Sequence, residues 1–149
     1  MKRGVKIGLL SILIARIDCT SAAAQNEIPL TTFETFETFA DWCLNRDRLT
    51  SEAQHTVENL LEKVEAQECS EAEDTLASLT ELNRGYDEQI VDVTPLASLT
   101  HLTWLTLSNN QISDAKPLEG LTSLIEIDLS ENPWQDQRCP AQLAGICRF

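Results

Sequence analysis

The sequence lacks the features that mark membrane and nucleic-acid proteins. Its 149 residues hold no apolar run near the ~20 residues that span a bilayer, and no basic amphipathic stretch. Basic residues are scarce, with 11 Lys and Arg against 24 Asp and Glu, so the formal net charge is -13. Because such a surface repels phosphate groups, we expect no nucleic-acid partner. Hydrophobic residues at 42% and charged residues at 23% predict one folded, acidic domain.

The sequence also lacks the common catalytic motifs. It contains no P-loop, dinucleotide fingerprint, metalloprotease helix or EF-hand loop. The two histidines, His55 and His101, have no recognised nucleophile motif near them. Glu126 and Asp128 could act as an acid–base pair in a hydrolase, but exposed carboxylates on a strand are usually just solvated. We therefore expect no enzymatic activity, no cofactor and no metal, and keep such a hydrolase as the minor alternative.

The first 24 residues predict a secretory signal peptide. Three basic residues precede an apolar run at 7–15, and the alanines at 22–24 supply the small residues of a cleavage site. Arg16 and Asp18 interrupt the stretch between the two, so an uncleaved helix with a free tail is the alternative. We expect an exported protein, periplasmic or extracellular, that is not inserted in a membrane after cleavage. Removal of the peptide takes away four basic residues and one acidic residue, which leaves the mature chain more acidic.

Export gives the cysteines a structural meaning. Four lie beyond the signal peptide, an even number typical of disulfides in an oxidising compartment. Because two lie in the N-terminal third and two in the last eleven residues, we favour Cys43–Cys69 and Cys139–Cys147 among the three pairings. The first bond would hold the first two predicted helices together. A metal site at Cys43, His55 and Cys69 is the alternative, although spacings of 12 and 14 lack the tight cysteine pair of zinc modules.

Three helices are predicted ahead of residue 80. Aromatic residues recur every third position over 33–42, which places them along one side of a helical segment. From Ser51, apolar residues at helical spacing predict an amphipathic helix of roughly four turns. A third helix is predicted from Ser70, since Ser70 and Glu73 have the spacing of a capping box.

Residues 76–134 repeat with a period of 22. The segment 102–112 fits the template L-x-x-L-x-L-x-x-N-x-L, with isoleucine in the last position. The repeat combines a fixed period, an asparagine at one position and a Pro-Leu pair at another. Because all three must occur together, chance rarely produces the pattern. The shift superposes Pro95 on Pro117, Leu99 on Leu121, Leu102 on Leu124, Leu105 on Ile127, Leu107 on Leu129 and Asn110 on Asn132.

The segment LTHLTWLTLSNNQISDAKPLEGL, residues 99–121, resembles the leucine-rich-repeat proteins, in particular the 22-residue repeats of bacterial internalins. A helical cap ahead of the repeats is also similar to that family. The first unit, 76–96, departs from the pattern, because it carries LNRGYDEQI, one residue longer and without the asparagine. We expect it to form a degenerate first coil. The resemblance implies a secreted binding scaffold and no reaction.

These observations predict an α+β solenoid, a short leucine-rich-repeat stack with parallel strands. Asn110 and Asn132 are expected to be structural, because their amides can satisfy backbone groups where the chain leaves each strand. Two complete repeats and one degenerate one are near the ~3 units that stability requires, so both ends must contribute. The expected organisation is a signal peptide at 1–24, a helical N-terminal cap at 25–79, repeats at 80–134 and a disulfide-pinned C-terminal cap at 135–149.

The outward strand positions are the expected binding site. Trp104 would stand between Glu81 and Glu126, and an aromatic ring flanked by carboxylates suits a basic protein or peptide partner. Alternatively, Trp104 folds down against a loop, and the chain is a structural or relic envelope protein with no specific ligand. Three strands offer a face of only ~200 to 300 Å² against ~800 Å² in a standard interface, so other surface must add to it. The predicted partner-binding residues are Glu81, Trp104, Thr106, Glu126 and Asp128.

Overall fold

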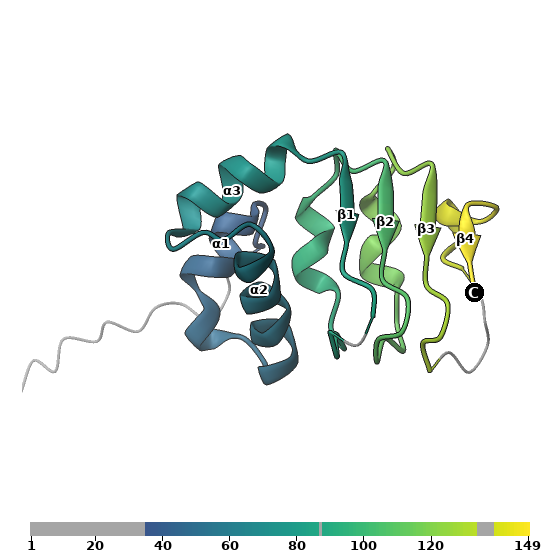
Figure 1. Cartoon of the computed structure of the whole chain (residues 1–149), viewed down its shortest axis with the longest axis horizontal. Coiled ribbons are helices and arrows are strands. Elements are labelled where there is room, and N and C mark those ends of the chain that lie inside the picture. The colour runs from purple at the N-terminus through teal and green to yellow at the C-terminus, as the bar shows by residue number, and fades with distance from the viewer. Residues whose placement is uncertain (1–34, 87, 134–138) are drawn as a thin grey trace, which may run out of the picture. The chain divides into compact units, whose positions relative to one another are not determined.

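The computed structural model describes residues 35–86, 88–133 and 139–149, which all belong to one compact unit. The predicted signal peptide lies outside these ranges. Three helices lie at one end of a parallel four-stranded sheet (Figure 1). None of the helices in the described ranges is both long and apolar enough to span a bilayer. The elements are α1 (Phe39–Leu44), η1 (Arg46–Arg48), α2 (Ser51–Lys63), α3 (Cys69–Ser78), β1 (Glu81–Asn83), η2 (Thr94–Ser98), β2 (Trp104–Thr106), η3 (Lys116–Gly120), β3 (Glu126–Asp128), η4 (Ala141–Leu143) and β4 (Cys147–Arg148).

The aromatic helix begins later than its spacing predicts. Phe33 lies outside the described residues, and Phe36 precedes α1, where its ring packs 4.6 Å from that of Trp42. A capping box starts the helix: the Thr38 hydroxyl accepts from the Asp41 N–H at 3.1 Å, and the Asp41 carboxylate accepts from the Thr38 N–H at 2.9 Å. Thr38 is extended, with φ -119° and ψ 161°, so the helix cannot continue backward.

Because of this capping box, the pKa of the Asp41 carboxyl reports whether the start of α1 is folded. Hydrogen bonds from the backbone and then the side chain of Thr38 lower the pKa of Asp41 from its ordinary 3.8. A group whose pKa is lower in the folded protein stabilises it above the unfolded pKa, and this contribution is lost as the pH falls through the folded pKa. We expect an NMR titration to place the Asp41 midpoint below 3.8 and Thr38→Ala to raise it. A midpoint at or above 3.8 in the unsubstituted protein would contradict the capping geometry.

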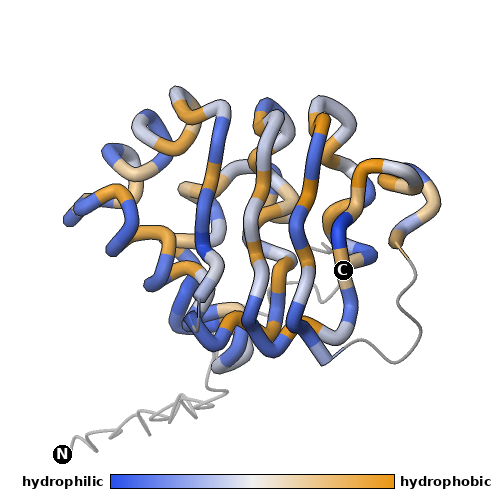
Figure 2. Tube along the Cα trace, turned by 45° about the vertical axis from the view of Figure 1, so that its right-hand side comes forward, coloured by the Kyte–Doolittle hydropathy of each residue, from blue (hydrophilic) through white to orange (hydrophobic). Residues whose placement is uncertain are grey.

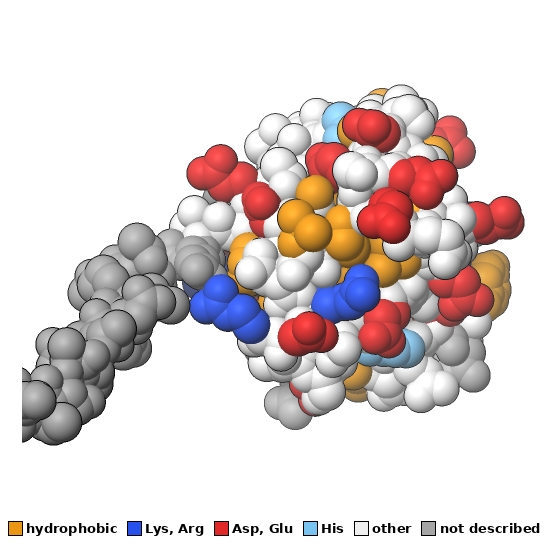
Figure 3. All heavy atoms as spheres, turned by 90° about the vertical axis from the view of Figure 1, so that its left-hand side faces the viewer, with side chains coloured by type: hydrophobic (Ala, Val, Ile, Leu, Met, Phe, Trp, Pro, Cys, Tyr) orange, Lys and Arg blue, Asp and Glu red, His pale blue; other side chains and the backbone are white. Residues whose placement is uncertain are grey.

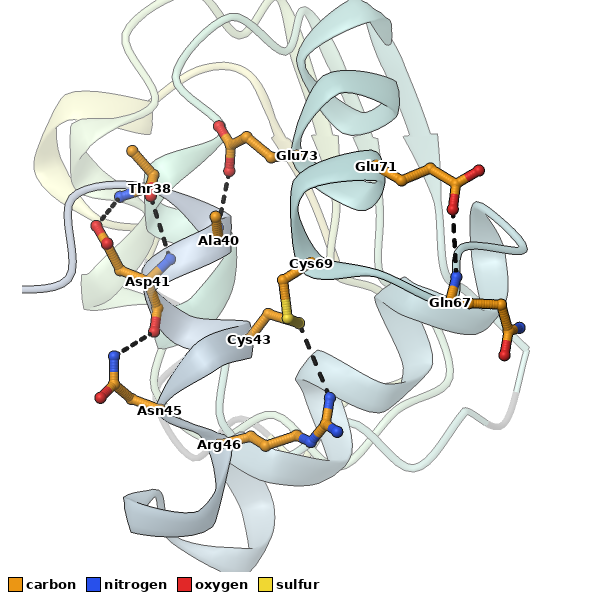
Figure 4. The surroundings of a disulfide bond; sticks show 10 residues. All are labelled: Thr38, Ala40, Asp41, Cys43, Asn45, Arg46, Gln67, Cys69, Glu71 and Glu73. Atoms are coloured by element: carbon orange, nitrogen blue, oxygen red, sulfur yellow. Dashed lines mark hydrogen bonds between the residues drawn. A yellow bond between two sulfur atoms is a disulfide. The ribbon is translucent and has the colours of Figure 1, made fainter.

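The prediction of a capping box at Ser70 is wrong. Helix α3 begins one residue earlier, at Cys69, and its N-cap residue Glu68 makes no side-chain cap hydrogen bond. Glu73 instead accepts from the N–H of Ala40 at 2.8 Å (Figure 4). Ala40 lies in the first turn of α1, where backbone N–H groups have no partner within the helix. The Glu73 carboxylate thus binds the backbone of another helix, and not that of its own helix as the local pattern predicted.

Two disulfides lie in the described residues. Cys43 pairs with Cys69 and Cys139 with Cys147, the pairings that the sequence favours. The first bond joins α1 to α3 (Figure 4), and not α1 to α2 as expected, because Cys69 is the first residue of α3. Helix α2 itself occupies the expected range from Ser51.

Removing the Cys43–Cys69 bond is expected to cost stability through the unfolded chain. The bond closes a separation of 26 residues, and Cys43 is buried. Replacing both cysteines with alanine should lower the free energy of unfolding by about 3 kcal/mol on the chain-entropy model. The matched control removes Cys139–Cys147, whose separation of only 8 residues predicts a smaller loss. Urea denaturation of the two double variants measures the difference, and an equal or reversed order would argue against this account.

The strands are parallel and lie in the order β1-β2-β3-β4. Leu105 lies opposite Ile127 on the adjoining strand, as the 22-residue period predicts, and Leu82 places the degenerate first unit in the same register. The chain returns through η2 and η3, both of which have proline in their first turn. Strand β4 was not predicted: Cys147 pairs with Ile127, so the end of the chain extends the sheet.

One hydrophobic core runs through the helices and the repeats. Figure 2 shows apolar and polar residues alternating along the strands, as expected when one face of a sheet is buried. Side chains of the helices and of the repeats belong to the same cluster of buried residues, so the helices have no core of their own. The largest fully buried side chains are Phe39, Leu60, Leu76, Leu82, Ile90, Leu96, Leu102, Leu105, Leu107, Ile112, Leu118 and Leu121.

Each repeat asparagine ties its unit to the one before. The Asn110 side chain accepts from the Ile90 N–H at 2.9 Å and donates to the carbonyls of Arg84 and Leu107 at 2.8 and 3.0 Å. Asn132 makes the equivalent set of bonds one repeat later, again with the preceding unit. These contacts satisfy backbone groups that the curved chain leaves unpaired.

In the degenerate unit, Glu88 stands two residues before Ile90, where Asn110 stands before Ile112. Its carboxylate accepts from the Asn59 side chain of α2 at 2.9 Å and lies 3.0 Å from the Arg84 guanidinium. Arg84 is buried and its Nε donates to the Asn59 side-chain oxygen. The departure from the repeat pattern is therefore a polar joint between α2 and the first repeat, formed by Asn59, Arg84 and Glu88.

Candidate protein-binding face

The outward row across the strands carries Trp104 at its centre. Register places Glu81 of β1 and Glu126 of β3 opposite Trp104 on either side. The indole keeps 43% of its surface exposed, Glu81 is exposed and Glu126 is half-buried. The next residue of each strand turns into the core, so the three outward side chains form one row on the solvent side of the sheet.

A second outward row crosses the sheet one pleat further along. It contains Asn83, Thr106, Asp128 and Arg148 in consecutive strands. Thr106 and Asp128 are half-buried. Asp128 accepts from the N–H of Ser130 at 3.0 Å and from its hydroxyl at 2.6 Å, so its carboxylate holds the turn that follows β3.

Arg148 is a site residue that the sequence analysis missed. Its guanidinium lies 2.9 Å from the Glu126 carboxylate, with 67% of the Arg148 side chain and 23% of the Glu126 side chain exposed. The pair gives Glu126 a cation within the protein, whereas no cation among the described residues pairs with Glu81. The free negative charge of the Trp104 row therefore lies on the β1 side. The cue nearest to it in the sequence was the neighbouring Cys147, which the disulfide with Cys139 fixes within the C-terminal segment.

Two exposed apolar residues border these rows and were also missed. Ile125 precedes β3 and is 61% exposed, and Tyr86 follows β1 and is 77% exposed. Tyr86 has φ 71°, and Asn109 and Glu131 have positive φ at the corresponding positions of the next units. This left-handed residue turns the chain away from the strand in all three units, and in the first unit it presents an aromatic ring.

The two carboxylates of the hydrolase alternative have partners within the protein. Glu126 and Asp128 are bound to Arg148 and Ser130, and neither lines the two hollows described below. No group of three His, Cys, Asp or Glu side chains is placed to hold a metal ion within the described ranges.

Both histidines contact backbone carbonyls. The Nε2 of His55 lies 2.7 Å from the carbonyl of Glu88, and that of His101 lies 2.9 Å from the carbonyl of Leu76. These bonds connect the helices to the repeats.

Two hollows lie away from the Trp104 row. One, of about 540 Å³, lies between the start of α1 and η2, with Glu37 as the one ionisable residue among the described ones that line it. The other, of about 240 Å³, is lined by Ser51, Glu52, His55, Gln89 and Val91.

Comparison with known proteins assigns the repeats. Residues 100–137 match the family described as leucine-rich repeats in two copies, a range that contains β2, η3 and β3. No curated protein matches the chain. Proteins with such repeats are typically non-enzymatic, and the repeats commonly mediate protein–protein interaction.

Proposed function

We propose that this leucine-rich repeat protein is an exported binding module, without enzymatic activity, that holds a basic segment of a protein or peptide on the outward face of its sheet. The observation that carries the proposal is the row Glu81–Trp104–Glu126, in which an exposed indole lies in register between two carboxylates. Two cysteine pairs at disulfide distance support an oxidising compartment outside the cytoplasm. The 22-residue period favours the internalin type of repeat.

The chemistry of the row selects a cation. A Lys or Arg side chain over an indole face gains about 0.5 to 1 kcal/mol at an exposed site. Glu81 is exposed and has no cation beside it among the described residues, so it adds attraction on the β1 side. Tryptophan is also among the residues most enriched in binding hot spots. Because the face is small, we expect Trp104 and Glu81 to supply most of its affinity.

We propose that residues 25–79 and 135–149 act as caps on the repeats. Phe39, Leu60 and Leu76 share the core of the repeats, which supports the first assignment. Leu143 joins the same core from the C-terminal side, which supports the second. A stack of few units exposes apolar ends that such segments cover.

Affinity capture with the oxidised protein tests the proposal. Bait lacking residues 1–24 is exposed to the envelope and medium of the producing cell, and bound proteins are quantified by mass spectrometry. We expect Trp104→Ala to reduce the captured partner at least ten-fold, about 1.4 kcal/mol. The control is Leu44→Ala, which also shortens an exposed apolar side chain to alanine, but in α1, away from the sheet. Leu44 is 73% exposed, and its replacement should leave capture unchanged.

Two outcomes would reject the proposal. If the folded Trp104→Ala variant captures the partner as well as the unsubstituted protein does, the outward face of the sheet is not the binding site. Hydrolysis that is lost in a Glu126→Gln and Asp128→Asn double variant would instead support the carboxylate hydrolase.

A further inference from the structure

Strand β1 has an open edge. The carbonyl of Thr80 and the N–H groups of Arg84 and Tyr86 all bond to the β2 side, with donor–acceptor distances of 3.2, 2.8 and 3.0 Å. In a parallel ladder, alternate residues turn their backbone groups to opposite neighbours. The N–H and carbonyl of Glu81 and Asn83 therefore point away from β2.

No described residue occupies that edge. The sheet order ends at β1, and no hydrogen bond from the described ranges reaches the backbone of Glu81 or Asn83 on its outer side. Both residues are exposed. Unpaired strand edges are templates for an added strand. The short length of β1 and the carboxylate at its start disfavour pairing with an acidic or uncharged strand, so the segment that fits this edge is a basic one.

At the opposite edge of the sheet, an added strand supplies a basic side chain to the outward row. There β4 pairs with the outer side of β3, and its Arg148 reaches across to Glu126 at 2.9 Å. Glu81 occupies the same row as Glu126, on the far side of Trp104, but has no strand beyond it. A basic side chain on an added strand would stand toward Glu81 as Arg148 stands toward Glu126.

We propose that the outer edge of β1 binds an extended, basic segment of the partner as a fifth strand. The backbone of Glu81 and Asn83 pairs with the segment, and a Lys or Arg side chain of the segment lies against the Glu81 carboxylate beside Trp104. Figure 3 shows acidic side chains spread over this end of the molecule, with Lys and Arg side chains confined to two places, so most of its surface charge favours a cationic ligand. This inference rests on the proposed function and specifies how the same face engages its partner.

A defined peptide tests the edge directly. The probe is acetyl-Thr-Arg-Val-Arg-Val-Thr-amide, titrated into the isotope-labelled, oxidised protein and followed by NMR. We expect binding to move the amide signals of Glu81 and Asn83 downfield and to slow their hydrogen exchange. Methylating the backbone nitrogens of the probe keeps its side chains and should weaken binding at least ten-fold. Replacing both arginines with glutamate should abolish it.

Variants of β1 separate backbone from side chain. Asn83→Pro removes the outward N–H without breaking a bond to β2, and proline is tolerated on strand edges. Its matched control is Asn83→Ala, because both variants lose the hydrogen bond from the Gly85 N–H to the Asn83 side chain. We expect Asn83→Pro to bind the probe at least ten-fold more weakly than Asn83→Ala, and Glu81→Gln to bind it several-fold more weakly than the unsubstituted protein.

The outcomes divide the two proposals. Undiminished binding of the methylated probe, or unmoved amides of Glu81 and Asn83, would overturn the edge, and the methylated probe decides the matter even if Asn83→Pro does not fold. If the probe then still requires Trp104, the edge fails while the proposed face stands. If neither methylation nor Trp104→Ala weakens binding, both fail.

Discussion

Replacing Asn110 with alanine is expected to lower the free energy of unfolding by about 4 kcal/mol, since several buried backbone groups then lose their partner at roughly 1 to 3 kcal/mol each. Asn110 is only 3% exposed. Its side chain serves the N–H of Ile90 and the carbonyls of Arg84 and Leu107, which belong to two successive units. Water cannot replace these bonds without opening the core, so the loss should appear as a lower midpoint in urea with little change in slope.

Two neighbouring substitutions serve as controls. Asn132→Ala removes the same pattern of bonds from a half-buried position, where water can reach the freed groups, so we expect a smaller loss. Asn109→Gly changes the adjacent exposed residue, whose φ of 54° glycine adopts freely, and should be neutral or slightly stabilising. If Asn110→Ala costs no more than Asn132→Ala, the side chain does not connect the units as described.

Replacing Arg84 with methionine is expected to destabilise the protein by about 3 to 5 kcal/mol, the usual cost of removing one member of a buried charged network. The Arg84 side chain is 10% exposed and serves both the Glu88 carboxylate and the Asn59 side-chain oxygen. Methionine fills similar space but leaves the buried Asn59 oxygen without a donor. Because Asn59 belongs to α2, the helices should loosen from the first repeat, and amide exchange in α2 should accelerate more than in β3.

A double-mutant cycle isolates the contact. The pair Asn59→Leu with Arg84→Met replaces the two buried members by apolar side chains, a change that is often nearly neutral, and leaves the Glu88 carboxylate at a position that is 33% exposed, where water can solvate it. We therefore expect the double variant to be more stable than the sum of the single losses implies. Glu88→Gln keeps an acceptor for Asn59 at a position whose side chain is 33% exposed, so its effect should be smaller. Strict additivity of the first two substitutions would show that Asn59 and Arg84 do not interact.

The repeat pattern predicted more of the fold than the helical patterns did. A 22-residue period fixes which residues of successive units are neighbours, and one inward leucine sets the direction of both side chains beside it. The pairing of Leu105 with Ile127 and the outward row through Trp104 both follow. The capping box at Ser70 was misplaced because the same four residues also suit the interior of a helix, and a contact with α1 decided between the two.

The sequence by itself determined the repeats, their register and the outward position of Trp104 between Glu81 and Glu126, because these follow from a short period repeated along one chain. Only the tertiary structure decided that β4 extends the sheet, that Arg148 binds Glu126 and leaves Glu81 as the free carboxylate, and that Arg84 and Glu88 join the repeats to α2. Each of these contacts links residues 20 or more positions apart through a single bond or a two-residue strand. Such contacts do not recur at a fixed spacing along the sequence, so no local pattern predicts them.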